Sequence, residues 1–151
     1  MTVRGSGRAP LRASVLGATA MSARDVVRGF LDQLAGGDAA TIVAMFTDDA
    51  VIDMPGGDDL PWAGRWQGRA AIEDYFRVMP AALAMHEHVI NTWVVDGDTV
   101  SVNGEEAGSS KLSGKHYRAK WCWVFTVRDG GIAVWDAYED TQALSACGPW
   151  R

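Results

Sequence analysis

The chain has 151 residues, of which 48% are hydrophobic and 22% are charged, and its formal net charge is −5. These values are typical of one soluble globular domain that buries a sizeable core. An acidic chain without a long lysine or arginine run argues against nucleic acid or an anionic membrane surface as the partner, because both require an electropositive footprint. No apolar run in the sequence approaches the length of a membrane span.

The first twenty residues differ in composition from the rest of the chain. They contain three arginines, several glycines and no acidic residue, and their only apolar patch is weak for the central region of a signal peptide. We therefore expect residues 1–20 to form a disordered or weakly ordered tail. Residues 21–145 are expected to form the domain, and residues 146–151 a short C-terminal tail.

The two cysteines, Cys122 and Cys147, match neither a zinc nor a redox spacing and are too few for a dense disulfide framework. Free thiols in a reducing cytoplasm are the expected state, and a single disulfide is the alternative. We accordingly expect a cytoplasmic protein.

Helical patterns occupy the first half of the chain. Ser22 is a candidate N-cap for a helix whose apolar stripe, residues 26–34, ends before a Gly-Gly pair. A second short helix is predicted over residues 38–46. A third is predicted from about residue 69 to Pro80, with apolar residues at helical spacing.

Strand patterns dominate after the third helix. One strand, "AVIDMP" (50–55), precedes that helix and is followed by a loop that contains Trp62 and Trp66. Four more segments alternate or are rich in strand-forming residues and are separated by turn signals. They are "HEHVINTWVV" (86–95), "TVSVNGEEAG" (99–108), "KHYRAKWCWVFTV" (115–127) and "IAVWDAYED" (132–140). This order predicts an α+β fold in which an antiparallel sheet curls over three N-terminal helices.

The segment "KWCWVFTV" (120–127) places unusual aromatic surface on one strand. Successive strand side chains point to opposite faces, so Trp121, Trp123 and Phe125 share one face, which we expect to be buried. The opposite, convex face of the sheet is predicted to be too apolar for a monomer, which favours a homodimer through the sheet. Its apolar residues are Cys122, Val124, Ile132 and Val134.

The segments "DDAVIDMPGGDDLPWAGRWQGRAAIEDYF" and "WVFTVRDGGIAVWDAYEDTQAL" resemble the SnoaL-like proteins of the nuclear transport factor 2-like superfamily. The resemblance covers about residues 23–144. It implies a cone-shaped, curved antiparallel sheet that is closed by helices around one deep apolar pocket. The superfamily hosts ketosteroid isomerase, limonene epoxide hydrolase, polyketide cyclases and proteins without catalytic activity, so the reaction does not follow from the fold.

Two of the known chemistries are poorly matched by residues at the corresponding positions. In the alignment, Met54, Phe30 and Trp123 occupy the positions of the base and the two oxyanion donors of ketosteroid isomerase. At the positions that correspond to the Asp-Arg-Asp triad of limonene epoxide hydrolase, this chain has one carboxylate, Glu106. The other two positions hold a glycine and an alanine. Neither mechanism is expected to operate unchanged.

Three polar residues are candidate catalytic groups. Glu106 shares a face with apolar residues of its strand, where an unpaired carboxyl group is costly. The resemblance places His88 in the pocket, and it places Asp53 in a row that faces the cone. Two carboxyls and a histidine suit general acid–base catalysis, because burial raises a carboxyl pKa toward neutrality. Each also has a purely structural interpretation as a hydrogen-bonded or ion-paired side chain.

We therefore predict an acid–base enzyme that cyclises or isomerises a hydrophobic small molecule in secondary metabolism, including by epoxide-opening cyclisation. Epoxide hydrolysis and ligand binding without catalysis are the alternatives. The His-x-His pair near acids also fits a metal site, but the resemblance implies catalysis without a metal or other cofactor. Residues expected to contact the substrate are Val51, Trp66, Tyr75, His86, Tyr117, Trp121, Trp123 and Trp135.

Overall fold

A computed structural model describes residues 21–151, so the predicted N-terminal tail lies outside the described part of the chain. The helices are α1 (Ala23–Gly36), α2 (Ala39–Ala44), α3 (Arg69–Ala82) and α4 (Thr141–Ala146). The strands are β1 (Phe46–Met54), β2 (Gly64–Gln67), β3 (Leu83–Asp96), β4 (Thr99–Ser110), β5 (His116–Arg128) and β6 (Gly131–Glu139). Among these residues no helix has the length and apolar character needed to cross a membrane.

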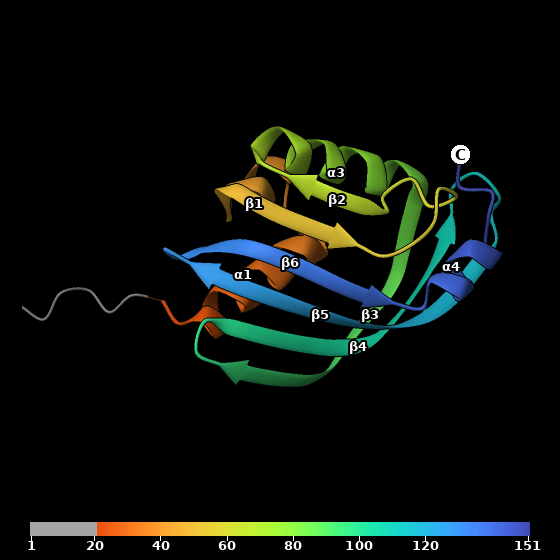
Figure 1. The fold of residues 1–151 in the computed structure, drawn as a ribbon. Helices are drawn as coiled ribbons and strands as arrows, with labels where there is room; N and C mark the ends of the chain where they lie inside the picture. Colours follow the sequence, from red (N-terminus) through yellow and green to blue (C-terminus); the bar gives the residue numbers. More distant parts are fainter. Residues whose placement is uncertain (1–20) are drawn as a thin grey trace, which may run out of the picture.

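The six strands form one sheet in the order β2-β1-β6-β5-β4-β3. The β1–β6 pair is parallel and the other four pairs are antiparallel. Figure 1 shows the sheet curving around α1, with α3 beside β1 and β2 and with α4 near the C-terminus. The predicted α+β class is confirmed. The helices are not all N-terminal, however, because α3 follows β2 and α4 follows β6.

The helix N-termini follow the capping signals in the sequence. The Ser22 hydroxyl accepts a hydrogen bond from the Asp25 backbone N–H (3.2 Å), and the Asp38 carboxylate accepts one from the Thr41 N–H (2.9 Å). The buried face of α1, which includes Val27 and Phe30, lies against the sheet. The predicted second helix was too long, because it ends at Ala44 and the chain enters β1 at once.

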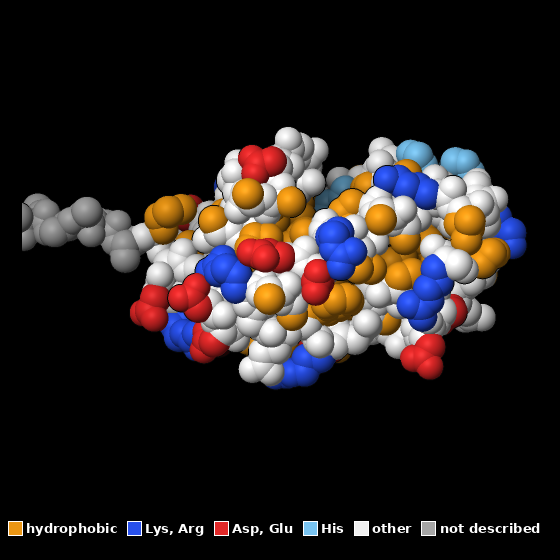
Figure 2. All heavy atoms as spheres, turned by 90° about the horizontal axis from the view of Figure 1, so that it is seen from above, with side chains coloured by type: hydrophobic (Ala, Val, Ile, Leu, Met, Phe, Trp, Pro, Cys, Tyr) orange, Lys and Arg blue, Asp and Glu red, His pale blue; other side chains and the backbone are white. Residues whose placement is uncertain are grey.

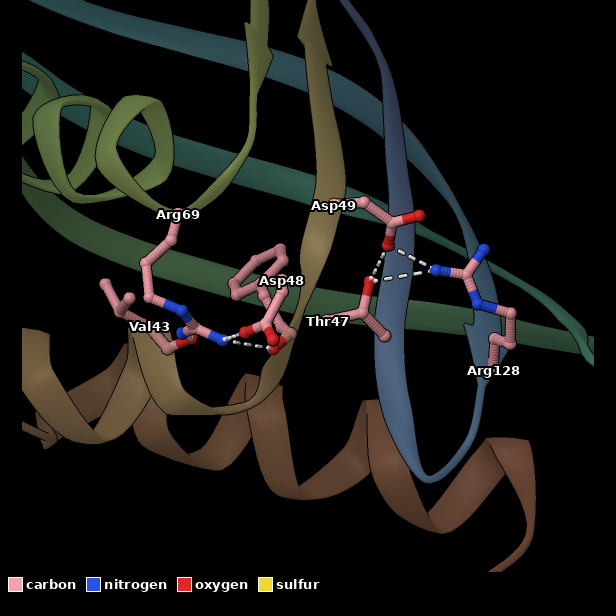
Figure 3. A network of polar contacts seen from close by, with 7 residues as sticks. Val43, Thr47, Asp48, Asp49, Arg69 and Arg128 are labelled. Carbon is pink, nitrogen blue, oxygen red and sulfur yellow. Dashed lines mark hydrogen bonds and ion pairs between the residues drawn. The ribbon is translucent and has the colours of Figure 1, made fainter.

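Arg69 fixes the start of α3 relative to the α2–β1 junction (Figure 3). Its guanidinium donates to the backbone oxygens of Val43 (2.9 Å) and Phe46 (3.2 Å) and to the Asp48 carboxylate (2.6 Å). These charge-assisted bonds tie the first residue of α3 to Val43 in α2 and to Phe46 and Asp48 in β1. The contact sets the position of α3, whose later turns face the interior cavity.

The C-terminal residues do not form a tail. Trp150 is 4% exposed and packs edge-on against Trp62, with ring centroids 4.8 Å apart. Its indole N–H donates to the Leu144 carbonyl (2.8 Å), and the Ser110 hydroxyl donates to the Pro149 carbonyl (3.0 Å). Residues 146–151 therefore pack on the domain and close one end of it.

Two further sequence predictions about the sheet were wrong. Trp66 lies in the edge strand β2 rather than in a loop, paired with Ile52 of β1. Ile132 is fully buried instead of lying on the convex face. A register shift after Thr126 pairs Ile132 with the inward-facing Val127 and so reverses the expected alternation.

Candidate active site

One cavity of about 760 Å³ lies between the concave face of the sheet and helices α1, α3 and α4. Its walls are mostly apolar and aromatic, and four carboxyl side chains line it: Asp32, Glu87, Glu106 and Glu139. Side chains of both charge signs are mixed on the face seen in Figure 2, with the histidines along one edge of the view. The cavity-lining residues that bear on the chemistry are Tyr75, His86, His88, Glu106, Trp123, Trp135 and Glu139.

Two glycines of β4 make the space in which Glu106 is buried. Gly104, Glu106 and Gly108 alternate with outward-facing residues and so share the concave face. A Cβ on Gly104 would lie 2.8 Å from Cζ2 of Trp121, and one on Gly108 would lie 2.8 Å from Cε1 of Tyr117. The glycines therefore let the aromatic side chains of β5 lean over β4 on both sides of Glu106. The "GEEAG" segment carries this signal, which the sequence analysis did not use.

The two carboxyls are each held by an aromatic donor. Tyr117 donates its hydroxyl hydrogen to Oε1 of Glu106 (2.9 Å), and Trp123 donates its indole N–H to Oε1 of Glu139 (3.0 Å). Glu106 is 4% exposed. Glu139 keeps some exposure at the end of β6, although its carboxyl group lies deep in the cavity wall.

Burial and mutual repulsion keep a proton on this pair. Burial, and then the charge of Glu139, raise the pKa of Glu106 from an ordinary value of 4.5 to about 8, against the opposing effect of the Tyr117 hydrogen bond. Burial also raises the pKa of Glu139, while the Trp123 hydrogen bond opposes that rise. Because two buried carboxylates repel each other, the pair loses its second proton only at a pH well above that of ordinary carboxyls. We assign that proton to Glu106.

His88 lies directly opposite Glu106 in the β3–β4 ladder. The residue is exposed overall, but its ring stacks on Trp121, with centroids 4.5 Å apart and planes 8° apart, and on Trp123 at 5.1 Å. Burial of the ring lowers the pKa of His88, so the neutral imidazole is favoured at neutral pH. The predicted proximity of His88 and Glu106 is thus present in the structure.

Asp53 does not join them. It follows Ile52, which packs in the core, and by strand alternation it lies on the opposite face of the sheet. There its carboxylate is half exposed and sits 3.9 Å from the guanidinium of Arg65. The expected convergence of Asp53 with His88 and Glu106 is therefore wrong.

The predicted binding residues divide into three groups. Tyr75, His86, Trp123 and Trp135 line the cavity. Three others contact lining residues from behind. Trp66 packs against Tyr75, and the Tyr117 hydroxyl donates to Glu106. Trp121 stacks on His88. Val51, like Asp53, is on the outer face of β1.

Glu139 lines the cavity but is not among the catalytic or binding residues that the sequence predicted. Alternation along "IAVWDAYED" puts Glu139 on the same face as Trp135 and Ala137, which is the available signal. Asp140 has a different role, because its carboxylate accepts the Ala143 N–H and caps α4. Within residues 21–151, no group of three or more His, Cys, Asp or Glu side chains is arranged to hold a metal ion.

Comparison with known proteins links the chain to one family and one fold. The family model described as a SnoaL-like domain matches residues 27–135. A steroid delta-isomerase from Nocardioides simplex is 39% identical over 56 residues, which make up 37% of this chain and 42% of that protein. The match therefore spans less than half of that relative's length.

Solved structures share the fold at low sequence identity. A nuclear transport factor 2-like protein from Burkholderia xenovorans is 24% identical with a TM-score of 0.76, covering 87% of this chain and 98% of that one. A protein assigned as a polyketide cyclase, from Pseudomonas putida, is 17% identical with a TM-score of 0.71, covering 84% and 98%. At these identities the likeness shows a shared fold rather than a shared reaction.

Gly108→Ala tests the packing around Glu106. The new methyl group would lie 2.7 Å from the Ala84 carbonyl oxygen and 2.9 Å from the Tyr117 hydroxyl. We expect a loss of about 1–3 kcal/mol in the free energy of unfolding, measured by urea denaturation. Gly36→Ala is the matched control, because a Cβ there meets nothing within 4 Å. A Gly108→Ala protein as stable as the control would contradict this account of the packing.

The pH dependence of stability tests the buried proton. Because the folded-state pKa of Glu106 is raised, the folded protein holds more protons than the unfolded chain between about pH 5 and about pH 8, and the free energy of unfolding falls as pH rises across that interval. Glu106→Gln should flatten this slope in urea titrations, with the remaining slope due partly to Glu139. Glu105→Gln, on the opposite face of β4, should leave it unchanged. Equal slopes for wild type and Glu106→Gln would contradict the raised pKa.

Proposed function

Because the chain belongs to the SnoaL-like domain family, we propose that it is an isomerase or cyclase that moves protons on a hydrophobic small molecule without a cofactor. The observation that carries this proposal is the buried carboxyl pair, Glu106 and Glu139, in an aromatic cavity. A solvent-exposed carboxyl is ionised at neutral pH and is a poor proton donor, whereas a buried one that retains its proton is a competent acid.

Glu106 is the proposed general acid. Its proton would pass to an oxygen atom of the substrate, and the carboxylate that forms would keep the Tyr117 hydrogen bond (2.9 Å). Glu139 would stay ionised and hold Glu106 in its acid form by repulsion. Its own charge is stabilised by the Trp123 indole N–H (3.0 Å).

His88 is the proposed base. It is the cross-strand neighbour of Glu106, so acid and base lie on adjacent strands and face one cavity. Stacking on Trp121 and Trp123 restricts the ring, and no hydrogen bond to another residue of the described chain occupies its nitrogens. A neutral imidazole at the exposed edge of the cavity can take a proton from the substrate and exchange it with water.

The indole rings would lower the activation barrier of the reaction as well as bind the substrate. A substrate that develops positive charge on carbon, as an opening epoxide does, is attracted to an indole face by roughly 1–2 kcal/mol when desolvated. That is worth about tenfold in rate for one well-placed ring. Trp123 and Trp135 line the cavity and are in position for this role. Secondary metabolism is the setting that we propose for such a substrate.

The other chemistries of the superfamily have less support. The positions aligned with the base and one donor of ketosteroid isomerase carry Met54 and Phe30, both of which pack in the hydrophobic core. Epoxide hydrolysis would have to proceed with Glu106 alone, because it is the one carboxylate at the positions that correspond to the Asp-Arg-Asp triad of limonene epoxide hydrolase. The partial likeness to a steroid delta-isomerase is therefore weaker support than the geometry of the acid pair.

A homodimer through the convex face of the sheet is the assembly that we propose. Cys122, Val124 and Val134 are half-buried there rather than covered, and Tyr138 is 56% exposed. We expect light scattering at micromolar concentration to give twice the chain mass. Val124→Lys should reduce the measured mass toward that of one chain, because it places a charge on the convex face of the sheet. A monomeric mass for the wild type would overturn the proposal.

Glu106→Gln tests the function directly. The protein is incubated with hydrophobic ketones, enones and epoxides, and the products are analysed by mass spectrometry. Isomerisation or cyclisation conserves mass, whereas hydrolysis adds a water. The amide keeps the shape of the carboxyl but releases no proton, so we expect turnover to fall on the order of 10²-fold with little change in affinity.

Glu105→Gln, on the other face of the same strand, is the control and should keep full activity. Wild-type turnover in Glu106→Gln would remove the acid role. Binding of these compounds without conversion of any of them would leave a ligand-binding module and overturn the enzymatic proposal.

A further inference from the structure

The last residues of the chain are anchored to the turn between β4 and β5. The backbone carbonyl oxygens of residues 147, 148 and 149 accept side-chain hydrogen bonds from Ser113 (2.7 Å), Lys115 (3.1 Å) and Ser110 (3.0 Å), in that order. Donor and acceptor in each bond lie between 33 and 39 residues apart in the sequence. Three successive carbonyls with one partner each hold this segment in one position on the domain, so residue 150 has a defined place.

The anchored segment places Trp150 against Tyr117, the residue that donates to Glu106. The indole N–H of Trp150 donates to the Leu144 carbonyl (2.8 Å), which fixes the orientation of the buried ring. The ring packs edge-on against Trp62 and Tyr117, with centroids 4.8 and 6.1 Å away. Within residues 21–151, these are the two aromatic rings that pair with Trp150, so its contact with the acid site runs through Tyr117.

Tyr117 depends on Trp150 for its position. The Tyr117 ring lies over Gly108, which has no side chain to hold it, and a Cβ there would come within 2.9 Å of the tyrosine oxygen. Among the described residues, Trp150 is the aromatic ring that packs on Tyr117, and the hydroxyl makes one hydrogen bond, to Oε1 of Glu106 (2.9 Å). One hydrogen bond restrains a ring weakly, so removal of the Trp150 ring would leave space into which Tyr117 can turn.

The Tyr117 hydrogen bond favours the ionised form of Glu106. Burial and the charge of Glu139 raise the pKa of Glu106, and this bond opposes the rise. Burial and the Glu106 charge raise the pKa of Tyr117 itself, so its hydroxyl stays protonated and remains a donor. The other titratable groups that face Glu106 are His88 on β3, Tyr75 on α3 and Glu139 on β6. Without the Tyr117 bond, Glu106 would hold its proton more tightly and be a weaker acid.

We propose that Trp150 is a positioning residue of the site, because its ring keeps the Tyr117 hydroxyl on the Glu106 carboxyl. The C-terminal segment then takes part in holding the acid, in addition to closing one end of the domain. This inference rests on the proposed function for the catalytic role of Glu106, whereas the effect of Trp150 on Glu106 is measured on the protein without a substrate.

The acid dissociation constant of Glu106 reports whether the tyrosine is in place. It is measured by NMR on protein with isotope-labelled glutamate carboxyls, and Glu106→Gln identifies the signal by removing it. Trp150→Leu should lower the constant about tenfold, because the carboxylate loses a hydrogen bond. Tyr117→Phe, which deletes the donor, should lower it by the same factor. Trp150→Phe keeps a ring against Tyr117 and should restore most of the wild-type value.

The sign of the change separates positioning from simple sealing of the cavity. If Trp150 only excluded water, Trp150→Leu would let water reach Glu106 and raise the dissociation constant. The double variant Trp150→Leu/Tyr117→Phe should match Tyr117→Phe alone, because both changes break the same contact. Trp93→Leu is the matched control, since Trp93 is a half-buried tryptophan of β3 outside the cavity lining. An unchanged or raised constant in Trp150→Leu, additive effects in the double variant, or an equal change in Trp93→Leu would overturn the role of Trp150.

A second variant applies where Trp150→Leu does not fold. Ser110→Ala/Ser113→Ala removes two of the three anchors and leaves every ring in place. It should lower the dissociation constant of Glu106 by at least about twofold, and a wild-type constant would then contradict the proposal. Turnover separates the inference from the proposed function. A wild-type constant in Trp150→Leu, with Glu106→Gln inactive, removes only the role of Trp150, whereas wild-type turnover in Glu106→Gln removes only the acid role.

Discussion

The burial of one carboxyl group, that of Glu106, is the constraint on which the rest of the site depends. An ionised carboxylate in an apolar cavity costs several kcal/mol unless it is paired with a cation or protonated. The lysine of the cavity lining, Lys111, donates to the Pro80 carbonyl (2.6 Å) rather than to Glu106. The neighbours of Glu106 are instead the Tyr117 hydroxyl at 2.9 Å and a second acid, Glu139. The second acid makes ionisation harder, so the arrangement favours a protonated Glu106. A site that only needed to be stable would not gain from such repulsion.

The aromatic side chains around the pair hold it in place. Phe30 of α1 packs edge-on against Phe125 and Trp135, with centroids 5.6 and 5.2 Å away, and so couples the helix layer to the sheet. The ring of Tyr117 packs edge-on against that of Trp150 in the C-terminal segment, with centroids 6.1 Å apart. The donor to Glu106 is thus fixed between β4 and a segment distant in sequence. Rigid support of this kind keeps a buried proton donor in one geometry.

Strand alternation explains which parts of the site could be predicted. Along β4 and β5 the two faces differ clearly in polarity, so the inward placement of Glu106, Trp121 and Trp123 follows from the sequence. Along β1 the signal fails, because neighbouring residues Val51 and Ile52 are both buried and the pattern does not reveal which face holds Asp53. Register shifts such as the one that buries Ile132, and long-range packing of the C-terminal residues, have no local signature in the sequence.

The charge state of the pair also limits what the cavity accepts. In the charge state that we propose, with the proton on Glu106 and with Glu139 ionised, the Trp123 N–H offsets part of the Glu139 charge, and the remaining charge repels an anionic ligand. A strongly cationic ligand would stabilise both carboxylates and draw the proton off Glu106, which removes the acid. Neutral ligands leave the pair with its single proton. Under the proposed mechanism, the electrostatics that keeps a proton on Glu106 therefore favours an uncharged, hydrophobic substrate.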